Sequence, residues 1–118
     1  MRVAALVDDL LDRSKLAAAV PATTFVREPG AAGPADVVVD LATHSGDVET
    51  LRARQPATRI VAYGRHTDTD ALAAARAAGA DRVLARSAFF RDPAAAVAGE
   101  PGPVPPSPGG GSGRDGAA

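Results

Sequence analysis

The sequence contains no cysteine and no tryptophan, and aromatic residues make up only 3% of its 118 residues. The absence of cysteine excludes disulfide bonds and thiolate-bound zinc. Hydrophobic residues nevertheless make up 46% of the chain. We therefore expect a small domain whose core is built mainly from Ala, Val and Leu.

Long apolar runs and an excess of basic residues are also absent. No run approaches the roughly 18 apolar residues that a membrane span needs, and Met1-Arg2 leads directly into a short apolar run with no secretory signal. The net charge of −1 and the lack of a basic stripe argue against nucleic acid as a ligand. These features predict a cytoplasmic protein without membrane or nucleic-acid partners. The abundance of Ala and Arg is typical of a bacterial protein encoded in a GC-rich genome.

Strand-like and helix-like segments alternate through residues 1–98, which we predict to form one α/β domain. Short apolar or β-branched runs predict five strands, at residues 2–7, 23–26, 36–41, 59–63 and 82–85. Helical patterns follow four of them, at residues 9–20, 45–54, 67–78 and 92–98. The alternation predicts a parallel sheet with helices on both faces, and five strands favour the order 2-1-3-4-5.

Three details of the helices follow from the same reading. Leu10, Leu16 and Val20 are available to the buried face of the first helix. Thr67 and Asp70 have the spacing of a capping box. Residues 28–35 are interrupted by Pro and Gly, so the second helix is expected to be reduced or absent.

Residues 99–118 are rich in Pro, Gly and Ser. Such a composition cannot bury enough apolar surface to offset the entropy lost on ordering the chain. We expect a disordered tail.

Acidic residues follow two of the predicted strands. Asp8 and Asp9 come after the first strand, and Asp40 ends the third. In an open parallel sheet, ligands bind beyond the carboxyl ends of the strands, where the strand order reverses. Three carboxylates there predict either a Mg²⁺ site or a phosphoryl-acceptor site. The structural alternative is that Asp8 and Asp9 cap the first helix while Asp40 ends a strand.

These acidic residues and a later segment resemble a known family. The pair Asp8-Asp9, the single Asp40 and the run Gly79-Ala80-Asp81 occur in the order found in response-regulator receiver domains, which have the CheY-like, flavodoxin-like fold. The resemblance covers about residues 2–98. It implies that Asp40 is the phosphoacceptor and that Asp8 and Asp9 hold the metal.

Two positions depart from the receiver pattern. The receiver lysine aligns with Arg86, and the hydroxyl residue that contacts the phosphoryl group aligns with Gly64. Glycine cannot donate that hydrogen bond, and Arg differs from Lys in reach and shape. Arg86 could instead hold Asp40 in a permanent ion pair. These departures favour a degenerate receiver.

Other residues extend the candidate site and its surroundings. Arg65 and His66 follow the fourth strand and could contact an anion at the rim of the sheet, or be solvated rim residues. Tyr63, Phe89 and Phe90 could form a partner interface, with packing of the last helix as the alternative.

Three functions remain open. The first is a noncatalytic, receiver-like regulatory module that acts through protein–protein contacts. The second is a Mg²⁺-dependent aspartyl phosphoacceptor of a two-component pathway. The third is a small enzyme or small-molecule binder that uses the same rim. We favour the first, with no enzymatic activity, no cofactor besides a Mg²⁺ alternative, and a protein partner that could be a second copy of the chain.

Overall fold

The structure is a computed structural model that describes residues 2–99. Its strands are β1 (Val3–Leu6), β2 (Thr23–Phe25), β3 (Asp36–Asp40), β4 (Ile60–Gly64) and β5 (Arg82–Ala85). All neighbouring strands are parallel, and their order is β2-β1-β3-β4-β5. The predicted sheet and strand order are confirmed. The predicted tail lies outside the described residues except for Gly99, so the domain boundary at residue 98 stays a prediction.

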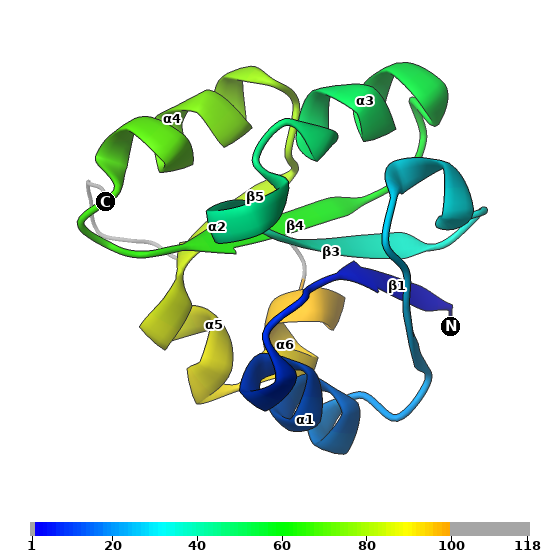
Figure 1. The fold of residues 1–118 in the computed structure, drawn as a ribbon, viewed down its shortest axis with the longest axis vertical. Helices are drawn as coiled ribbons and strands as arrows, with labels where there is room; N and C mark the ends of the chain where they lie inside the picture. Colours follow the sequence, from blue (N-terminus) through cyan, green and yellow to red (C-terminus); the bar gives the residue numbers. More distant parts are fainter. Residues whose placement is uncertain (1, 100–118) are drawn as a thin grey trace.

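Helices cover both faces of the sheet (Figure 1). They are α1 (Leu10–Ala19), the 3₁₀ helix η1 (Pro29–Ala31), α2 (Leu41–His44), α3 (Asp47–Arg54), α4 (Thr69–Ala77), α5 (Arg86–Arg91) and α6 (Pro93–Ala98). Helices α1, α5 and α6 lie on one face, and α2, α3 and α4 lie on the other. No helix formed by residues 2–99 is long and apolar enough to cross a membrane.

The sheet separates two hydrophobic cores. Leu16, Tyr63 and Phe89 belong to the core under α1, α5 and α6, whereas Leu51 and Ile60 belong to the core under α3 and α4. The central strands are apolar without alternation because both of their faces are buried, as is usual in parallel sheets. The core is therefore largely aliphatic, as the composition predicts.

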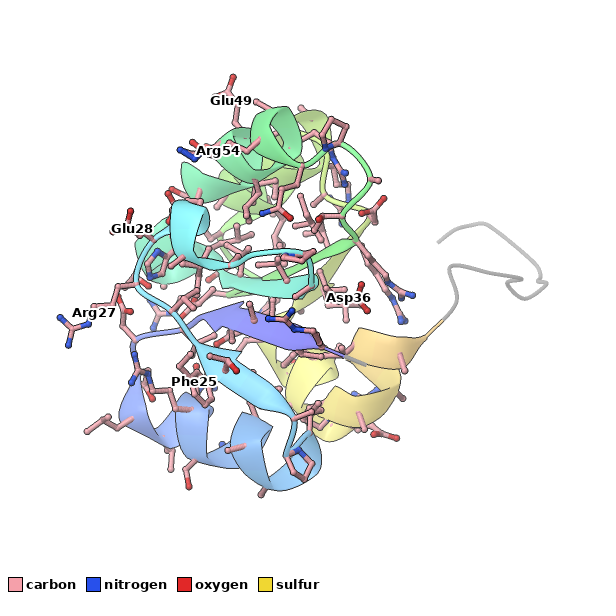
Figure 2. All side chains as sticks on the ribbon, turned by 90° about the vertical axis from the view of Figure 1, so that its right-hand side faces the viewer. Phe25, Arg27, Glu28, Asp36, Glu49 and Arg54 are labelled. Carbon is pink, nitrogen blue, oxygen red and sulfur yellow. The ribbon has the colours of Figure 1, made fainter. Side chains whose placement is uncertain are left out.

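The edge of the sheet at β2 lacks the usual covering helix. Only the short η1 occupies the connection between β2 and β3, and Ala32, directly after it, is buried against the core. Figure 2 shows this edge, where Arg27 and Glu28, between β2 and η1, project into solvent. The prediction of a reduced second helix is confirmed.

Two predicted details of the helices are wrong. Leu10 is 78% exposed, because Asp9 caps α1 and the buried side of the helix starts at Asp12 rather than at Leu10. Helix α4 is capped by Asp68, whose side chain accepts a hydrogen bond from the Ala71 amide at 3.3 Å, and not by Thr67. The short helices α2 and α5 lie in segments for which the sequence predicts no helix.

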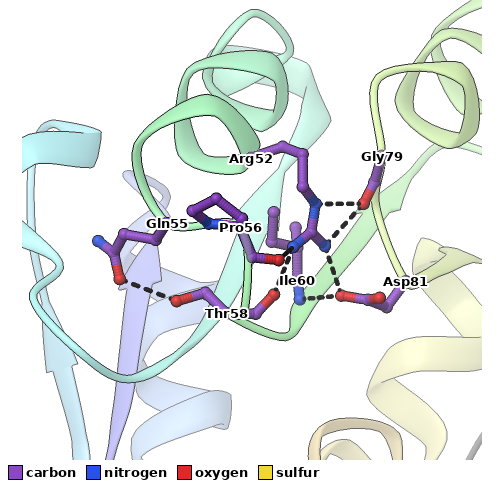
Figure 3. A network of polar contacts seen from close by, with 7 residues as sticks. All are labelled: Arg52, Gln55, Pro56, Thr58, Ile60, Gly79 and Asp81. Atoms are coloured by element: carbon purple, nitrogen blue, oxygen red, sulfur yellow. Dashed lines mark hydrogen bonds and ion pairs between the residues drawn. The ribbon is translucent and has the colours of Figure 1, made fainter.

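An arginine network fixes the amino end of the sheet (Figure 3). The Arg52 guanidinium donates to the backbone oxygens of Gly79, Pro56 and Thr58, at distances from 2.7 to 3.0 Å, and to the Asp81 carboxylate at 2.7 Å. Gly79 has a φ of 109°, and a Cβ atom there would lie 2.9 Å from Arg52 Cγ. The network joins the connections that lead into β4 and β5, and its close contact with Gly79 requires a residue without a side chain.

A candidate functional site at the carboxyl ends of the strands

An open hollow with a volume of about 460 Å³ lies beyond the carboxyl ends of the strands. We call it the acidic hollow; its charged lining residues are Asp8, Asp9, Asp12, Asp40, Arg65 and Arg86. Strands β1 and β3 are neighbours, so their ends deliver carboxylates to the same place. The structure thus brings Asp8, Asp9 and Asp40 to one hollow. Arg65 also lines it, whereas His66 is exposed and is not among the lining residues.

The Asp9 side chain has a structural role in this hollow. Its Oδ1 accepts a hydrogen bond from the Asp12 backbone amide at 3.0 Å, which makes Asp9 the N-cap of α1. A carboxylate is favourable there because the first amides of a helix lack partners within the helix. For Asp9, the structural alternative that it caps the first helix is confirmed.

Asp12 is a site residue that the sequence interpretation missed. It lies in the first turn of α1, and only 2% of it is exposed. The Tyr63 hydroxyl donates to Asp12 Oδ2 at 3.0 Å, and Arg86 Nη2 donates to Asp12 Oδ1. Burial raises the pKa of Tyr63, so this phenol remains neutral and available as a donor. The spacing could have indicated this position, because Asp12 precedes Leu16 by four residues and therefore lies on the same, buried side of the helix.

Arg86 pairs with Asp12 and not with Asp40. It is the first residue of α5, directly after β5, and among residues 2–99 its ion pair is with the Asp12 carboxylate. Its guanidinium also lies 5.2 Å from the centre of the Phe90 ring. The predicted ion pair between Arg86 and Asp40 is wrong, because the buried Asp12 is the partner that Arg86 reaches.

Asp40 is buried with little compensation for its charge. Only 6% of the residue is exposed, and its Oδ1 accepts a hydrogen bond from the Ala42 amide at 3.0 Å. Burial raises the pKa of Asp40, and the negative charge of Asp12 raises it further. The bond from Ala42 and the positive charges of Arg86 and His44 oppose this shift without cancelling it. The hollow therefore holds a carboxylate whose ionised form is disfavoured relative to water.

His44 joins two acidic residues at the rim of the acidic hollow. Its Nδ1 lies 2.7 Å from Asp47 Oδ2, and its Nε2 lies 3.1 Å from Asp8 Oδ1. Burial lowers the pKa of His44, but the two carboxylates raise it by more, so the pKa lies above its ordinary value. The imidazolium is the form that can donate to both carboxylates at once. Asp8 is thus tied to the end of α2.

Gly64 ends β4 and is buried beside the hollow. A Cβ atom there would lie 3.4 Å from side-chain atoms of Leu41 and Leu72. A methyl group therefore just fits, but a larger side chain requires these leucines to shift. The position supplies no hydroxyl to the acidic hollow.

The predicted Mg²⁺ ligands are not clustered around one point. No group of three or more His, Asp or Glu residues within residues 2–99 is placed to hold a metal ion. Asp8 contacts His44, Asp9 caps α1 and Asp12 pairs with Arg86. Three carboxylates of the hollow are thus engaged separately, and Asp40 accepts from the Ala42 amide; a Mg²⁺ ion at Asp8, Asp9 and Asp40 stays a prediction.

The aromatic residues that we considered for an interface are mostly in the core. Tyr63 and Phe89 are fully buried and stack with their ring centres 4.7 Å apart. Phe90 is half-buried and meets both rings edge-on. The interface prediction is therefore wrong for Tyr63 and Phe89. The exposed large hydrophobic residues in the described part of the chain are Leu10 and Leu11, at 78% and 62% exposure.

Comparisons with known proteins agree with this architecture. No protein-family model and no curated protein matches the sequence. A response regulator from Burkholderia pseudomallei, solved with a phosphorylated aspartic acid, calcium ion and citrate, is 21% identical; the match has a TM-score of 0.66 and covers 84% of this chain and 68% of that one. The fold is that of a receiver domain.

Two other response regulators have the same fold. Full-length FixJ from B. japonicum is 15% identical, with a TM-score of 0.61, and the match covers 80% of this chain and 58% of FixJ. A response regulator in red light signaling of R. palustris is 16% identical, with a TM-score of 0.60, and the match covers 80% of this chain and 89% of that one. These matches show that the chain has the receiver fold despite its low sequence identity.

Proposed function

We propose that the chain is a receiver-like regulatory module that acts through protein–protein contacts and has no phosphoryl-transfer or other enzymatic activity. The observation that carries the proposal is the ion pair between Arg86 and the buried Asp12. This pair engages Arg86, a cation of the hollow, with a carboxylate other than Asp40. The receiver fold is retained, while the groups that would serve a phosphoryl group are engaged elsewhere.

The charges of the acidic hollow oppose phosphorylation of Asp40. A phosphoryl group would add negative charge beside Asp12 and the other aspartates, and like charges in one site repel strongly. Arg86 is already paired, no cluster of three metal-binding side chains forms within residues 2–99, and Gly64 has no hydroxyl to donate. Among the described residues that line the hollow, the exposed Arg65 is the cation that has no ion pair to offset the added charge.

A partner surface is available next to the hollow. Leu10 and Leu11 begin α1 directly after Asp9 and are largely exposed. Fully burying a leucine side chain contributes about 1.5–3 kcal/mol. A protein that covers the start of α1 would gain this energy and would also contact the rim of the acidic hollow.

The test is exposure of the protein to acetyl phosphate with Mg²⁺, followed by intact-mass analysis. We expect the mass to stay unchanged in the wild type and in an Asp40→Asn control. Stoichiometric modification that is lost in Asp40→Asn would contradict the proposal and support the phosphoacceptor alternative. A Mg²⁺ titration followed by amide chemical shifts provides the second measurement, with no response expected at Asp8, Asp9 or Asp40 at millimolar metal.

A further inference from the structure

Asp40 has no counter-ion, although it is almost completely buried. Only 6% of the residue is exposed, and it lines the acidic hollow. Its Oδ1 accepts from the Ala42 amide at 3.0 Å, and within residues 2–99 no ion pair and no second hydrogen bond reaches this carboxylate. Buried carboxylates are normally paired or fully hydrogen-bonded, because desolvation of a charge is costly. The second oxygen, Oδ2, is therefore an acceptor for a donor that enters the hollow.

The charges around the acidic hollow favour a cationic occupant. Four carboxylates and two guanidinium groups line the hollow. Arg86 is paired with Asp12, and His44 at the rim contacts two other carboxylates. Arg65 is exposed and forms no ion pair within residues 2–99. The lining thus keeps an excess of negative charge, which raises the local concentration of a positively charged ligand.

An apolar contact point lies beside the acidic hollow. A second hollow, of about 400 Å³, is lined by Asp8, Leu10 and two arginines. Asp8 lines both hollows, so they adjoin at this residue. Leu10 is 78% exposed, and Leu11 next to it is 62% exposed. A ligand that places a cation in the acidic hollow can therefore place an apolar group against Leu10.

We propose that the acidic hollow binds the ammonium group of a lysine side chain that the protein partner supplies, and that Asp40 Oδ2 is its acceptor. The inference rests on the proposed function, because it names the chemistry of the partner contact. An arginine binds a carboxylate best through both oxygens, and one oxygen of Asp40 is already used by the Ala42 amide. An ammonium group is a compact charge with three donors, which suits a single available oxygen.

The size of the acidic hollow and its apolar neighbour define the segment that is recognised. The volume of about 460 Å³ lies within the range of ligand-binding pockets. A lysine reaches a recessed carboxylate with its flexible aliphatic stem and delivers the charge at its end. The exposed Leu10 favours an apolar residue next to the lysine in the partner. The expected partner segment is therefore a lysine flanked by apolar residues.

The test uses a capped Leu-Lys-Leu peptide as the probe, titrated into the ¹⁵N-labelled protein with EDTA and without a phosphate donor. We expect saturable shifts of the Ala42 and Thr43 amides, with a dissociation constant on the order of 1 mM. A peptide with norleucine in place of lysine keeps the apolar stem and lacks the charge, so it should bind about tenfold more weakly. Equal binding of the two peptides, or no saturable shift with either, overturns the proposal.

Two matched variants separate Asp40 from the general charge of the protein. Asp40→Asn should weaken binding of the lysine peptide about tenfold. Asp36→Asn removes the same charge from the other end of β3 and should leave binding unchanged. Equal weakening in both variants would contradict a site at Asp40.

This experiment and the acetyl phosphate experiment can fail separately. Phosphorylation of Asp40 would contradict the proposed function whatever the peptides do. Absence of both phosphorylation and peptide binding would leave the proposed function standing and would reject lysine as the partner group. Leu10→Ser should weaken binding of the lysine peptide roughly threefold, since less apolar surface is then covered, and unchanged binding would contradict the contact with Leu10.

Discussion

The two ends of the sheet each contain an arginine that binds an aspartate, but the arginines are used differently. At the amino end, Arg52 makes five hydrogen bonds, four of them to backbone oxygens and one to Asp81. At the carboxyl end, Arg86 binds the side chain of Asp12, which also accepts from Tyr63. The first arrangement fixes loops, whereas the second neutralises a buried charge.

The two ends also differ in how completely their carboxylates are satisfied. In the Arg52 network, the Asp81 carboxylate accepts hydrogen bonds from both Arg52 and the Ile60 amide, the latter at 2.8 Å. Its charge therefore has two donors. In the acidic hollow, Arg86 compensates Asp12, and Asp40 is left with its bond from Ala42 and a raised pKa. Groups whose pKa is shifted by burial and nearby charges are common at functional sites, so Asp40 makes the carboxyl end the better candidate for one.

The largest effect is expected from Asp12→Ala. This change leaves the buried Tyr63 hydroxyl without its acceptor and Arg86 without its counter-ion, and we expect a loss of about 2–3 kcal/mol in the free energy of unfolding. Chemical denaturation measures it. Tyr63→Phe is the matched control and should cost only about 1 kcal/mol, since the ion pair remains. Wild-type stability in Asp12→Ala would show that the buried pair does not form.

Arg52→Lys should have the next largest effect. An ammonium group cannot reproduce the forked contacts to Gly79, Pro56 and Asp81, so we expect a loss of about 1–2 kcal/mol. The comparison of the two ends requires that this change leave the titration of Asp40 unaltered. A shift in the Asp40 titration would show that the two ends are coupled.

Asp40→Asn should stabilise the protein at neutral pH. The folded-state pKa of Asp40 is raised above 3.8, so ionisation costs more in the folded than in the unfolded protein, and this penalty is complete above the folded pKa. Asparagine removes the charge and can still accept from Ala42. We expect a gain of up to about 1 kcal/mol that fades as the pH falls through the folded pKa toward 3.8. Destabilisation at neutral pH would contradict a strained Asp40.

The smallest effect is expected from His44. Its folded-state pKa is raised above 6.5, so its contacts with Asp8 and Asp47 contribute stability that is complete below the unfolded pKa and is lost as the pH rises through the folded pKa. Because Asp8 is half-exposed, the contribution should be below about 1 kcal/mol. His44→Gln should remove this part of the pH dependence, and His66→Gln should not.

The sequence predicts the fold well because the fold depends on patterns that are local. The unbroken apolar run Val37–Val39 is buried on both faces, and the Pro and Gly residues at 28–35 leave only η1. Helix starts are harder to predict, because Asp68 and Thr67 are both capable caps and only the structure distinguishes them. The position of Leu10 depends on where the cap of α1 lies.

The site was predicted in part. The topology brings Asp8, Asp9 and Asp40 together, which follows from the strand order alone. The strand order does not predict the partner of Arg86, because Asp12 lies in a helix and is 74 residues away from Arg86 in the sequence. Which of several nearby carboxylates an arginine reaches is decided by packing, and the burial of Asp12 beside Tyr63 decides it here.

The most direct test of the central claim is the titration of the Asp40 carboxyl carbon by NMR in the wild-type protein. If Arg86 is held by Asp12, burial dominates at Asp40 and its pKa lies above the ordinary value of 3.8. If Arg86 instead pairs with Asp40, the guanidinium stabilises the carboxylate and the pKa lies below that value. A raised pKa is the result that we predict, and a lowered one would contradict the account.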